Sequence, residues 1–191
     1  MKFDRKNFFD AYKQQFATKL TQGQVNGLEQ LLGFFENDPE LTDLRWVAYM
    51  MATVKHECAD RWQPIEEFAS GKQYEGRDDL GNVQPGDGPR YKGRGYVQIT
   101  GRANYRKFSR LLDIDLIGSP KLALDPPTSY KIMSLGMRNG LFTGKDLYDY
   151  IHDTICDYRN ARRIINALDQ ADKITRYAQK LETTLRESLQ P

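Results

Sequence analysis

The sequence predicts a single, mostly α-helical domain over residues 1–191, with at most a small β-hairpin around residues 91–100. Helical spacing of apolar residues at both ends of the chain and a central segment that is apolar on most sides carry this prediction. A length of 191 residues suits one domain at roughly 150 residues per domain. Hydrophobic residues make up 39% and charged residues 28%, which is typical of a globular chain.

The N-terminal third predicts three helices. Apolar residues recur at helical spacing in 7–20, and Thr21 to Gln24 fit a capping box that opens a second helix reaching about Phe35. A third helix, 41–58, is apolar on most sides and belongs in a core, with Trp46 as a core residue. It ends in His56 and Glu57, where a core helix meets a cleft.

Residues 59–99 are rich in proline and glycine and predict a long ordered loop, a feature that is often functional. The alternation in 96–100 indicates a short strand. Further helices are expected over 102–112, from Asp125-Pro126 to about 140, from Thr143, from Asp157 to about 166, and over 169–189. The apolar stripe of the last helix should pack into the core, and a membrane-surface role is the alternative.

Several chemistries are excluded by their motifs. Asp60 stands where an HExxH zinc helix needs its second histidine, and two histidines with two cysteines make a tetrahedral metal site improbable. No phosphate-binding P-loop, GxGxxG or GxSxG pattern is present. Cys58 and Cys156 are interpreted as two buried thiols. We therefore expect neither a metal nor a cofactor.

Two carboxylates remain as candidates for chemistry: Glu57 at a helix end, and Glu66 or Glu67 on the following loop. Paired carboxylates hydrolyse glycosides, one as a protonated general acid in an apolar pocket and the other as an ionised base. Glu57 follows an apolar helix and suits the acid. Solvated or ion-paired glutamates are the competing explanation.

The segment Tyr91-Lys92-Gly93-Arg94-Gly95-Tyr96-Val97-Gln98-Ile99-Thr100-Gly101-Arg102-Ala103-Asn104-Tyr105 resembles the pattern Y-x-G-R-G-x-x-Q-[IL]-[ST]-x-x-x-N-Y of the family 19 glycoside hydrolases. The helix ending in His56-Glu57, the block Gln63 to Glu67 and the block Ala161 to Asn166 resemble further parts of that family, in the same order. The resemblance covers about 44–180 and implies a lysozyme-like fold and no cofactor.

The resemblance implies residue roles. Glu57 would be the general acid and Glu67 the base, with Glu66 as the alternative because many members space the carboxylates by nine residues. Thr100 would help to hold the attacking water. Sugar-contacting positions are implied or considered at Gln98, Asn104, Tyr105, Asn166, Trp62 and Arg94, although core packing for Trp62 and a structural ion pair for Arg94 are equally reasonable.

Departures from the family pattern bear on the substrate. Ala167 follows Asn166 where glycine is usual, and Cys58-Ala59-Asp60 replaces the T/S-G-G of chitinases. These differences favour bacteriolytic members, namely phage endolysins of muramidase type that cut β-1,4 links in peptidoglycan by an inverting mechanism. Chitin is the alternative substrate. A non-catalytic module that binds cell wall or nucleic acid is the alternative from another class.

Residues 86–110 contain seven basic residues and one acidic residue, whereas the whole chain has a net charge of +2. We interpret the stretch as attracting an anionic wall polymer rather than nucleic acid. The N-terminus lacks the apolar region of a signal peptide, and the longest apolar run, Trp46 to Ala52, is too short for a membrane span. We expect a monomer that is made in the host cytoplasm and does not insert stably into a membrane. It would act on the cell wall after release, and a companion pore-forming protein is one route of release.

Overall fold

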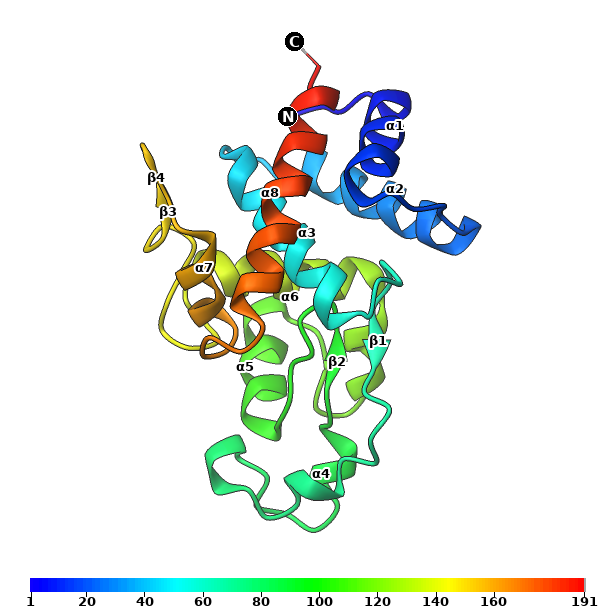
Figure 1. The fold of residues 1–191 in the computed structure, drawn as a ribbon. Helices are drawn as coiled ribbons and strands as arrows, with labels where there is room; N and C mark the ends of the chain where they lie inside the picture. Colours follow the sequence, from blue (N-terminus) through cyan, green and yellow to red (C-terminus); the bar gives the residue numbers. More distant parts are fainter. Residues whose placement is uncertain (191) are drawn as a thin grey trace. The chain divides into compact units, whose positions relative to one another are not determined.

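The computed structural model describes residues 1–190, and its helices confirm the mostly α prediction (Figure 1). Within these residues, eight α-helices accompany only two small antiparallel strand pairs. The chain divides into two compact units, Met1–Trp62 with Ser134–Pro191, and Gln63–Met133. The expectation of one catalytic domain over 1–191 stays a prediction. None of the helices in the described part of the chain is long and apolar enough to cross a membrane.

In the first unit, local capping explains where helices begin. Helix α1 (Arg5–Phe16) begins after Asp4, whose carboxylate accepts a hydrogen bond from the Asn7 amide. Helix α2 (Gln22–Glu36) has the predicted capping box of Thr21 and Gln24. Helix α3 (Leu44–Glu57) is capped by Asp43 and is buried along most of its length.

Helix α8 (Ala171–Ser188) packs against α3 and α1, and Figure 1 shows it running beside both. The apolar stripe that the sequence identified is largely inside, since Ile174, Ala178, Leu181 and Leu185 are all fully buried. Core packing of the last helix is therefore confirmed over the membrane-surface alternative. Close packing also explains a glycine in α2, because a Cβ on Gly27 would lie 2.3 Å from the Trp62 carbonyl oxygen.

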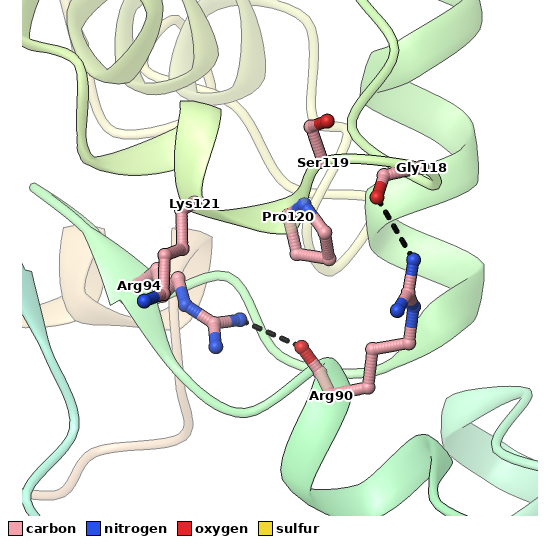
Figure 2. A pocket seen from close by; sticks show the side chains of 6 residues that line it. All are labelled: Arg90, Arg94, Gly118, Ser119, Pro120 and Lys121. Carbon is pink, nitrogen blue, oxygen red and sulfur yellow. Dashed lines mark hydrogen bonds between the residues drawn. The ribbon is translucent and has the colours of Figure 1, made fainter.

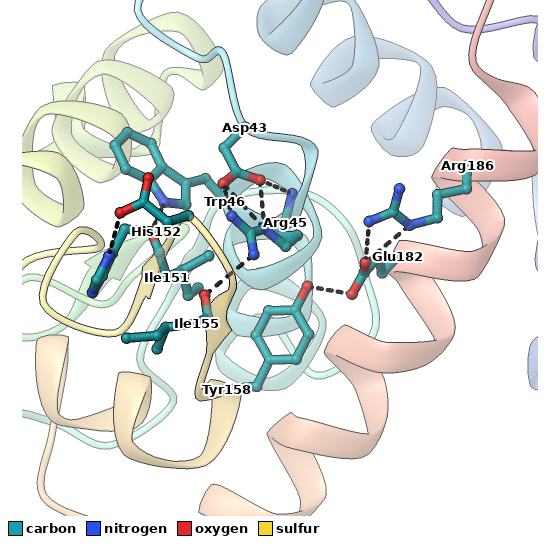
Figure 3. A network of polar contacts seen from close by, with 10 residues as sticks. Asp43, Arg45, Trp46, Ile151, His152, Ile155, Tyr158, Glu182 and Arg186 are labelled. Carbon is teal, nitrogen blue, oxygen red and sulfur yellow. Dashed lines mark hydrogen bonds and ion pairs between the residues drawn. The ribbon is translucent and has the colours of Figure 1, made fainter.

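A small hairpin of β3 (Ile151–His152) and β4 (Ile155–Cys156) is attached to the start of α3 (Figure 3). The Trp46 indole donates to the Ile151 carbonyl at 2.8 Å, and Arg45 donates to the Ile155 carbonyl at 3.2 Å. Helix α7 (Tyr158–Ala161), capped by Asp157 as predicted, follows the hairpin and continues into the 3-10 helix η4 (Arg162–Ile164).

The second unit has little regular structure. It contains β1 (Ile65–Glu66) paired with β2 (Arg94–Gly95), helices α4 (Asp87–Arg90) and α5 (Arg102–Leu112), and the 3-10 helices η1 (Lys72–Tyr74), η2 (Asp78–Leu80) and η3 (Pro120–Leu124). Helix α6 (Pro126–Arg138) contains the boundary between the two units. The α5 bounds agree with the prediction.

Several sequence expectations are wrong. The strand expected over 96–100 is reduced to an antiparallel bridge of Ile99 with Arg94, because 96–98 form a turn in which Gln98 adopts a left-handed φ of 53°. This bridge is the small hairpin expected around 91–100. The helix expected from Thr143 does not form, because the Thr143 hydroxyl donates to the carbonyls of Arg163 and Ile164 rather than capping its own segment. Of the two cysteines expected inside, Cys58 is buried but Cys156 is exposed on the hairpin. Trp46, which was expected in the core, is only half-buried. Its indole N–H donates to the hairpin.

Candidate active site

Glu57 is the last residue of α3, and its carboxylate contacts a buried guanidinium. The Arg162 Nη1 donates to Glu57 Oε1 at 2.7 Å, and the Arg162 side chain is only 3% exposed against 17% for Glu57. The Arg162 Nε donates to the Asp169 carbonyl at 3.0 Å, which holds the guanidinium in place. The expectation of an apolar pocket around Glu57 is therefore wrong on the side that faces Arg162, because a guanidinium contacts the carboxylate there. What the contact provides is a fixed orientation for Oε1.

His56, beside Glu57, lies in the same helical turn. Burial lowers the pKa of His56 below its ordinary value of 6.5. The imidazole is therefore neutral near pH 7 and adds no positive charge next to Glu57.

Glu67 directly follows β1, and its carboxylate is held by neutral donors. The Tyr74 hydroxyl and the Gln73 amide each donate to Oε1 at 3.0 Å, and the Gly93 amide donates to Oε2 at 3.1 Å. Within residues 1–190, Glu67 forms no ion pair closer than 4 Å. A carboxylate offers about four acceptor positions. The three bonds therefore orient Glu67 and leave room on Oε2 for a water.

Glu66, one residue earlier, has a different environment. Its two oxygens pair with Lys92 at 3.0 Å and with Arg94 at 2.7 Å. Burial tends to raise the pKa of Glu66, but the hydrogen bonds from Lys92 and Arg94 outweigh it and hold that pKa below 4.5. Both oxygens are committed to cations, so Glu66 is an unsuitable proton acceptor.

Close contacts explain why positions 93 and 95 of the Gly93-Arg94-Gly95 motif are glycines. A Cβ on Gly93 would lie 2.9 Å from Gln98 Oε1 and 3.2 Å from Glu67 Oε2. Gly95 has a left-handed φ of 90°, and a Cβ there would lie 2.8 Å from the Ser129 hydroxyl. The motif therefore builds the backbone against which the Glu67 carboxylate rests.

Three further motif residues, Gln98, Thr100 and Asn104, are half-buried and form hydrogen bonds within the second unit. The Gln98 side-chain amide donates to the carbonyls of Ile65 and Gly95, which joins β1 to the turn. The Thr100 hydroxyl donates to the Gln98 carbonyl at 3.0 Å, and the Asn104 amide donates to the Thr100 carbonyl at 2.9 Å. Their proposed roles toward water and sugar stay predictions.

The structure contradicts direct sugar contact for three residues. Trp62 is fully buried and packs edge-on against Tyr12, so neither ring face is available to a sugar. Tyr105 is also fully buried, donates to the Lys92 carbonyl, and has a pKa raised to about 12 by burial. Arg94 is 5% exposed and is held by Glu66 and Tyr105, which confirms the structural ion pair.

Asn166 lies on the surface, in the segment after η4. Its side-chain oxygen accepts a hydrogen bond from the Ala167 amide at 2.8 Å. Its proposed sugar contact stays a prediction.

Sequence reasoning missed the residues that hold the two carboxylates: Arg162 for Glu57, and Gln73 with Tyr74 for Glu67. Arg162 lies inside the block 161–166 that the sequence singled out. The block therefore marked the position of Arg162 but did not reveal that its guanidinium contacts Glu57. Gln73 and Tyr74 lie in a loop without periodicity, where no pattern reveals which side chain a carboxylate meets.

Among known proteins, no family model matches the chain, and a curated relative matches part of the sequence. A protein of Haemophilus influenzae described as a "Glycosyl hydrolase family 19 domain-containing protein" is 36% identical over 58 residues, which are 30% of this chain and 29% of that relative. The match thus spans less than a third of the relative's length.

Solved structures with a similar fold cover most of this chain. Chitinase C from Streptomyces griseus has a TM-score of 0.56 at 21% identity and covers 90% of each chain. A family GH19, class IV chitinase from Zea mays has a TM-score of 0.53 at 17% identity, over 96% of this chain and 92% of that one. The chain has the fold of these chitinases, which confirms at the level of the fold the resemblance seen in the sequence.

Proposed function

We propose that the chain is a glycoside hydrolase that cleaves β-1,4 links in an amino-sugar polymer, with Glu57 as general acid and Glu67 as general base. The observation that carries the proposal is the environment of Glu67. Its carboxylate is oriented by three neutral donors and has no cation partner among residues 1–190, unlike its neighbour Glu66. The fold shared with chitinases supports a glycan as substrate.

The proposed reaction inverts the anomeric carbon. Protonated Glu57 gives its proton to the glycosidic oxygen as the bond from that oxygen to C1 breaks. Glu67 removes a proton from a water whose oxygen forms the new bond to C1 from the opposite face. Thr100 helps to hold this water.

Arg162 is a positioning residue in this scheme. Glu57 becomes an anion when its proton leaves, and the guanidinium 2.7 Å from Oε1 stabilises the charge that develops there. Since Arg162 is buried and anchored to the Asp169 carbonyl, it needs little rearrangement during the reaction.

Peptidoglycan is the proposed substrate, and the protein would act as a phage-type endolysin. The supporting observations are Cys58-Ala59-Asp60 after Glu57 and the basic stretch 86–110, which suits an anionic wall polymer. A monomer that reaches the wall after release belongs to the same proposal. Chitin is a second candidate because the solved structures that share the fold are chitinases.

Product analysis tests the proposal. Purified peptidoglycan and chitin oligosaccharides are digested separately, and the products are identified by mass spectrometry, with proton NMR of the first product formed. We expect soluble fragments with muramic acid at the reducing end and inverted anomeric configuration. Reducing-end glucosamine from peptidoglycan would show a glucosaminidase instead. Cleavage of chitin alone would select the chitinase, and a retained anomer would contradict the inverting mechanism, in which Glu67 acts as a base.

A further inference from the structure

A cavity in the second unit, outside the proposed carboxylate pair, is lined by cations. It has a volume of about 370 Å³ and is lined by Arg90, Arg94, Gly118, Ser119, Pro120 and Lys121. Figure 2 shows Arg90 and Lys121 on two sides of the Pro120 ring. None of the lining residues is acidic.

The charges around the cavity are only partly balanced. Arg94 is paired with Glu66, and Asp115 lies beside the lining, where its carboxylate accepts from the Gly118 amide. Arg90 donates only to neutral oxygens, among them the Ile117 and Gly118 carbonyls, both at 2.9 Å. Within residues 1–190, neither Arg90 nor Lys121 has a carboxylate within 4 Å. The cavity therefore presents two cations without anionic partners.

The cavity wall is rigid on one side and polar on another. Arg94 is 5% exposed and held at four points, by the Glu66 carboxylate, the Arg90 and Lys92 carbonyls and the Tyr105 hydroxyl. A buried, anchored guanidinium is a preorganised feature of a binding site. The Ser119 side chain adds a hydroxyl to the lining.

Size and chemistry indicate the occupant. A cavity of this volume holds far more than a single small ion, because one water takes about 30 Å³ in the liquid. It lies near the lower end of the ~300–1,000 Å³ range of ligand pockets. The cations select a carboxylate, and the Pro120 ring offers an apolar surface to small aliphatic side chains.

We infer that this cavity binds the carboxylate end of a short peptide, which in the proposed substrate is the peptide branch of peptidoglycan. The identification of that source rests on the proposed function. The site would distinguish a peptide-bearing wall polymer from a neutral polymer such as chitin. Phosphate binding at the same cations is a different proposal and is an outcome of the test.

The experiment measures binding in the absence of any glycan, so that its failure is separate from failure of the hydrolase proposal. The whole protein is titrated by NMR with N-acetyl-D-alanyl-D-alanine, with its C-terminal amide and with inorganic phosphate. Lys121 is the residue to change, because it is exposed and, within residues 1–190, its side chain forms no hydrogen bond or ion pair that holds the fold. Lys131, which is exposed on α6 and does not line the cavity, is the matched control.

We expect the acid to bind at least about tenfold more tightly than the amide, since only the acid carries the charge. Lys121→Glu should weaken binding of the acid about tenfold or more, Lys121→Met should weaken it less, and Lys131→Glu should have little effect. Thermal melting confirms that each variant is folded.

Three results would overturn the inference. The acid and the amide binding equally would show that the carboxylate is not recognised. Binding that is unchanged in both Lys121 variants would place the peptide elsewhere. Absence of peptide binding together with phosphate binding that depends on Lys121 would assign the cavity to phosphate.

Discussion

Glu66 and Glu67 are neighbours in the chain, yet their carboxylates have different chemistry because the surrounding loop provides cations to one and neutral donors to the other. Glu66 faces Lys92 and Arg94, whereas Glu67 faces Gln73, Tyr74 and the Gly93 amide. Glu66 is the last residue of β1 and Glu67 is the first residue after it, so the two side chains meet different neighbours.

The first prediction separates these two residues by substitution. Glu67→Gln should lower turnover of the cleaved polymer about a hundredfold or more, because the amide cannot accept a proton. Glu66→Gln should keep most of the turnover but lower the free energy of unfolding by about 1–3 kcal/mol, since the buried Arg94 loses its charged partner. Turnover and chemical denaturation are measured on both variants. The reverse pattern would assign the base to Glu66, nine residues after Glu57.

The second prediction concerns pH. The folded-state pKa of Glu66 is held below its ordinary value, so the folded protein resists protonation more than the unfolded chain does. The stability from Glu66 is therefore present above about pH 4.5 and is lost as pH falls through the lower folded-state pKa. Denaturation of wild type between pH 7 and pH 3 should show this loss, and Glu66→Gln should show less of it. Parallel curves for the two proteins would contradict the linkage.

The third prediction concerns Glu57. Glu57→Gln should reduce turnover about 10²–10⁴-fold because the amide has no acidic proton to give. It should also cost about 1 kcal/mol of stability, since the amide replaces the carboxyl group as the hydrogen-bond acceptor for the buried Arg162. Glu187→Gln, the same change at an exposed position of α8, is the control and should affect neither quantity. Normal turnover in a folded Glu57→Gln protein would remove Glu57 from the acid role.

Residues of the candidate site were predictable to the extent that they stand in a motif. Glu57 and Glu67 are proposed from their blocks, and the ion pair that the sequence offered as one of two roles for Arg94 is present. Tyr105 was misplaced as a sugar contact, and Trp62 was left open between core and sugar contact, because a sequence gives residue type and order but not which aromatic faces are covered. A motif residue can be required for the backbone around a site without touching a ligand, and Tyr105, bonded to the Lys92 carbonyl, is of this kind.

Helices were predictable from patterns confined to a few neighbouring residues. The capping box of Thr21 and Gln24 and the Asp157 cap formed as expected because both donor and acceptor lie within one turn. The hairpin of β3 and β4 was missed because its attachments, Arg45 and Trp46, lie more than 100 residues away in the chain. Long-range bonds of this kind leave no local signal.

The fourth prediction tests the role of α8. Leu181 is fully buried, where α8 packs on α3 and α1. Leu181→Ala should therefore lower the free energy of unfolding by about 2–5 kcal/mol. Arg176→Ala, at an exposed position of the same helix, should change it by less than about 0.5 kcal/mol. If Leu181→Ala left stability intact and instead reduced binding to anionic vesicles, the helix would have a membrane role.

Charge is the property that concerns the whole molecule, because the chain is nearly neutral and its positive charge is concentrated. The net charge is +2, while residues 86–110 contain seven basic residues and one acidic residue. The structure reduces the number that can attract a polymer, since Lys92 and Arg94 pair with Glu66, and Arg102 pairs with Asp87. Arg106 and Arg110 on α5 are exposed and have no carboxylate within 4 Å in the part of the chain that the structure describes.

The fifth prediction follows from these exposed cations. If they draw the protein to an anionic wall, lysis of wall fragments should slow as salt rises above about 0.15 M, where the Debye length is near 8 Å. Turnover of a small neutral oligosaccharide should change little over the same range, because encounter with it does not depend on charge. The double variant Arg106→Gln, Arg110→Gln should lyse walls more slowly at low salt and lose much of the salt dependence. Equal salt dependence on both substrates would show that salt acts on the folded enzyme itself, and the basic face of α5 would then have no part in wall encounter.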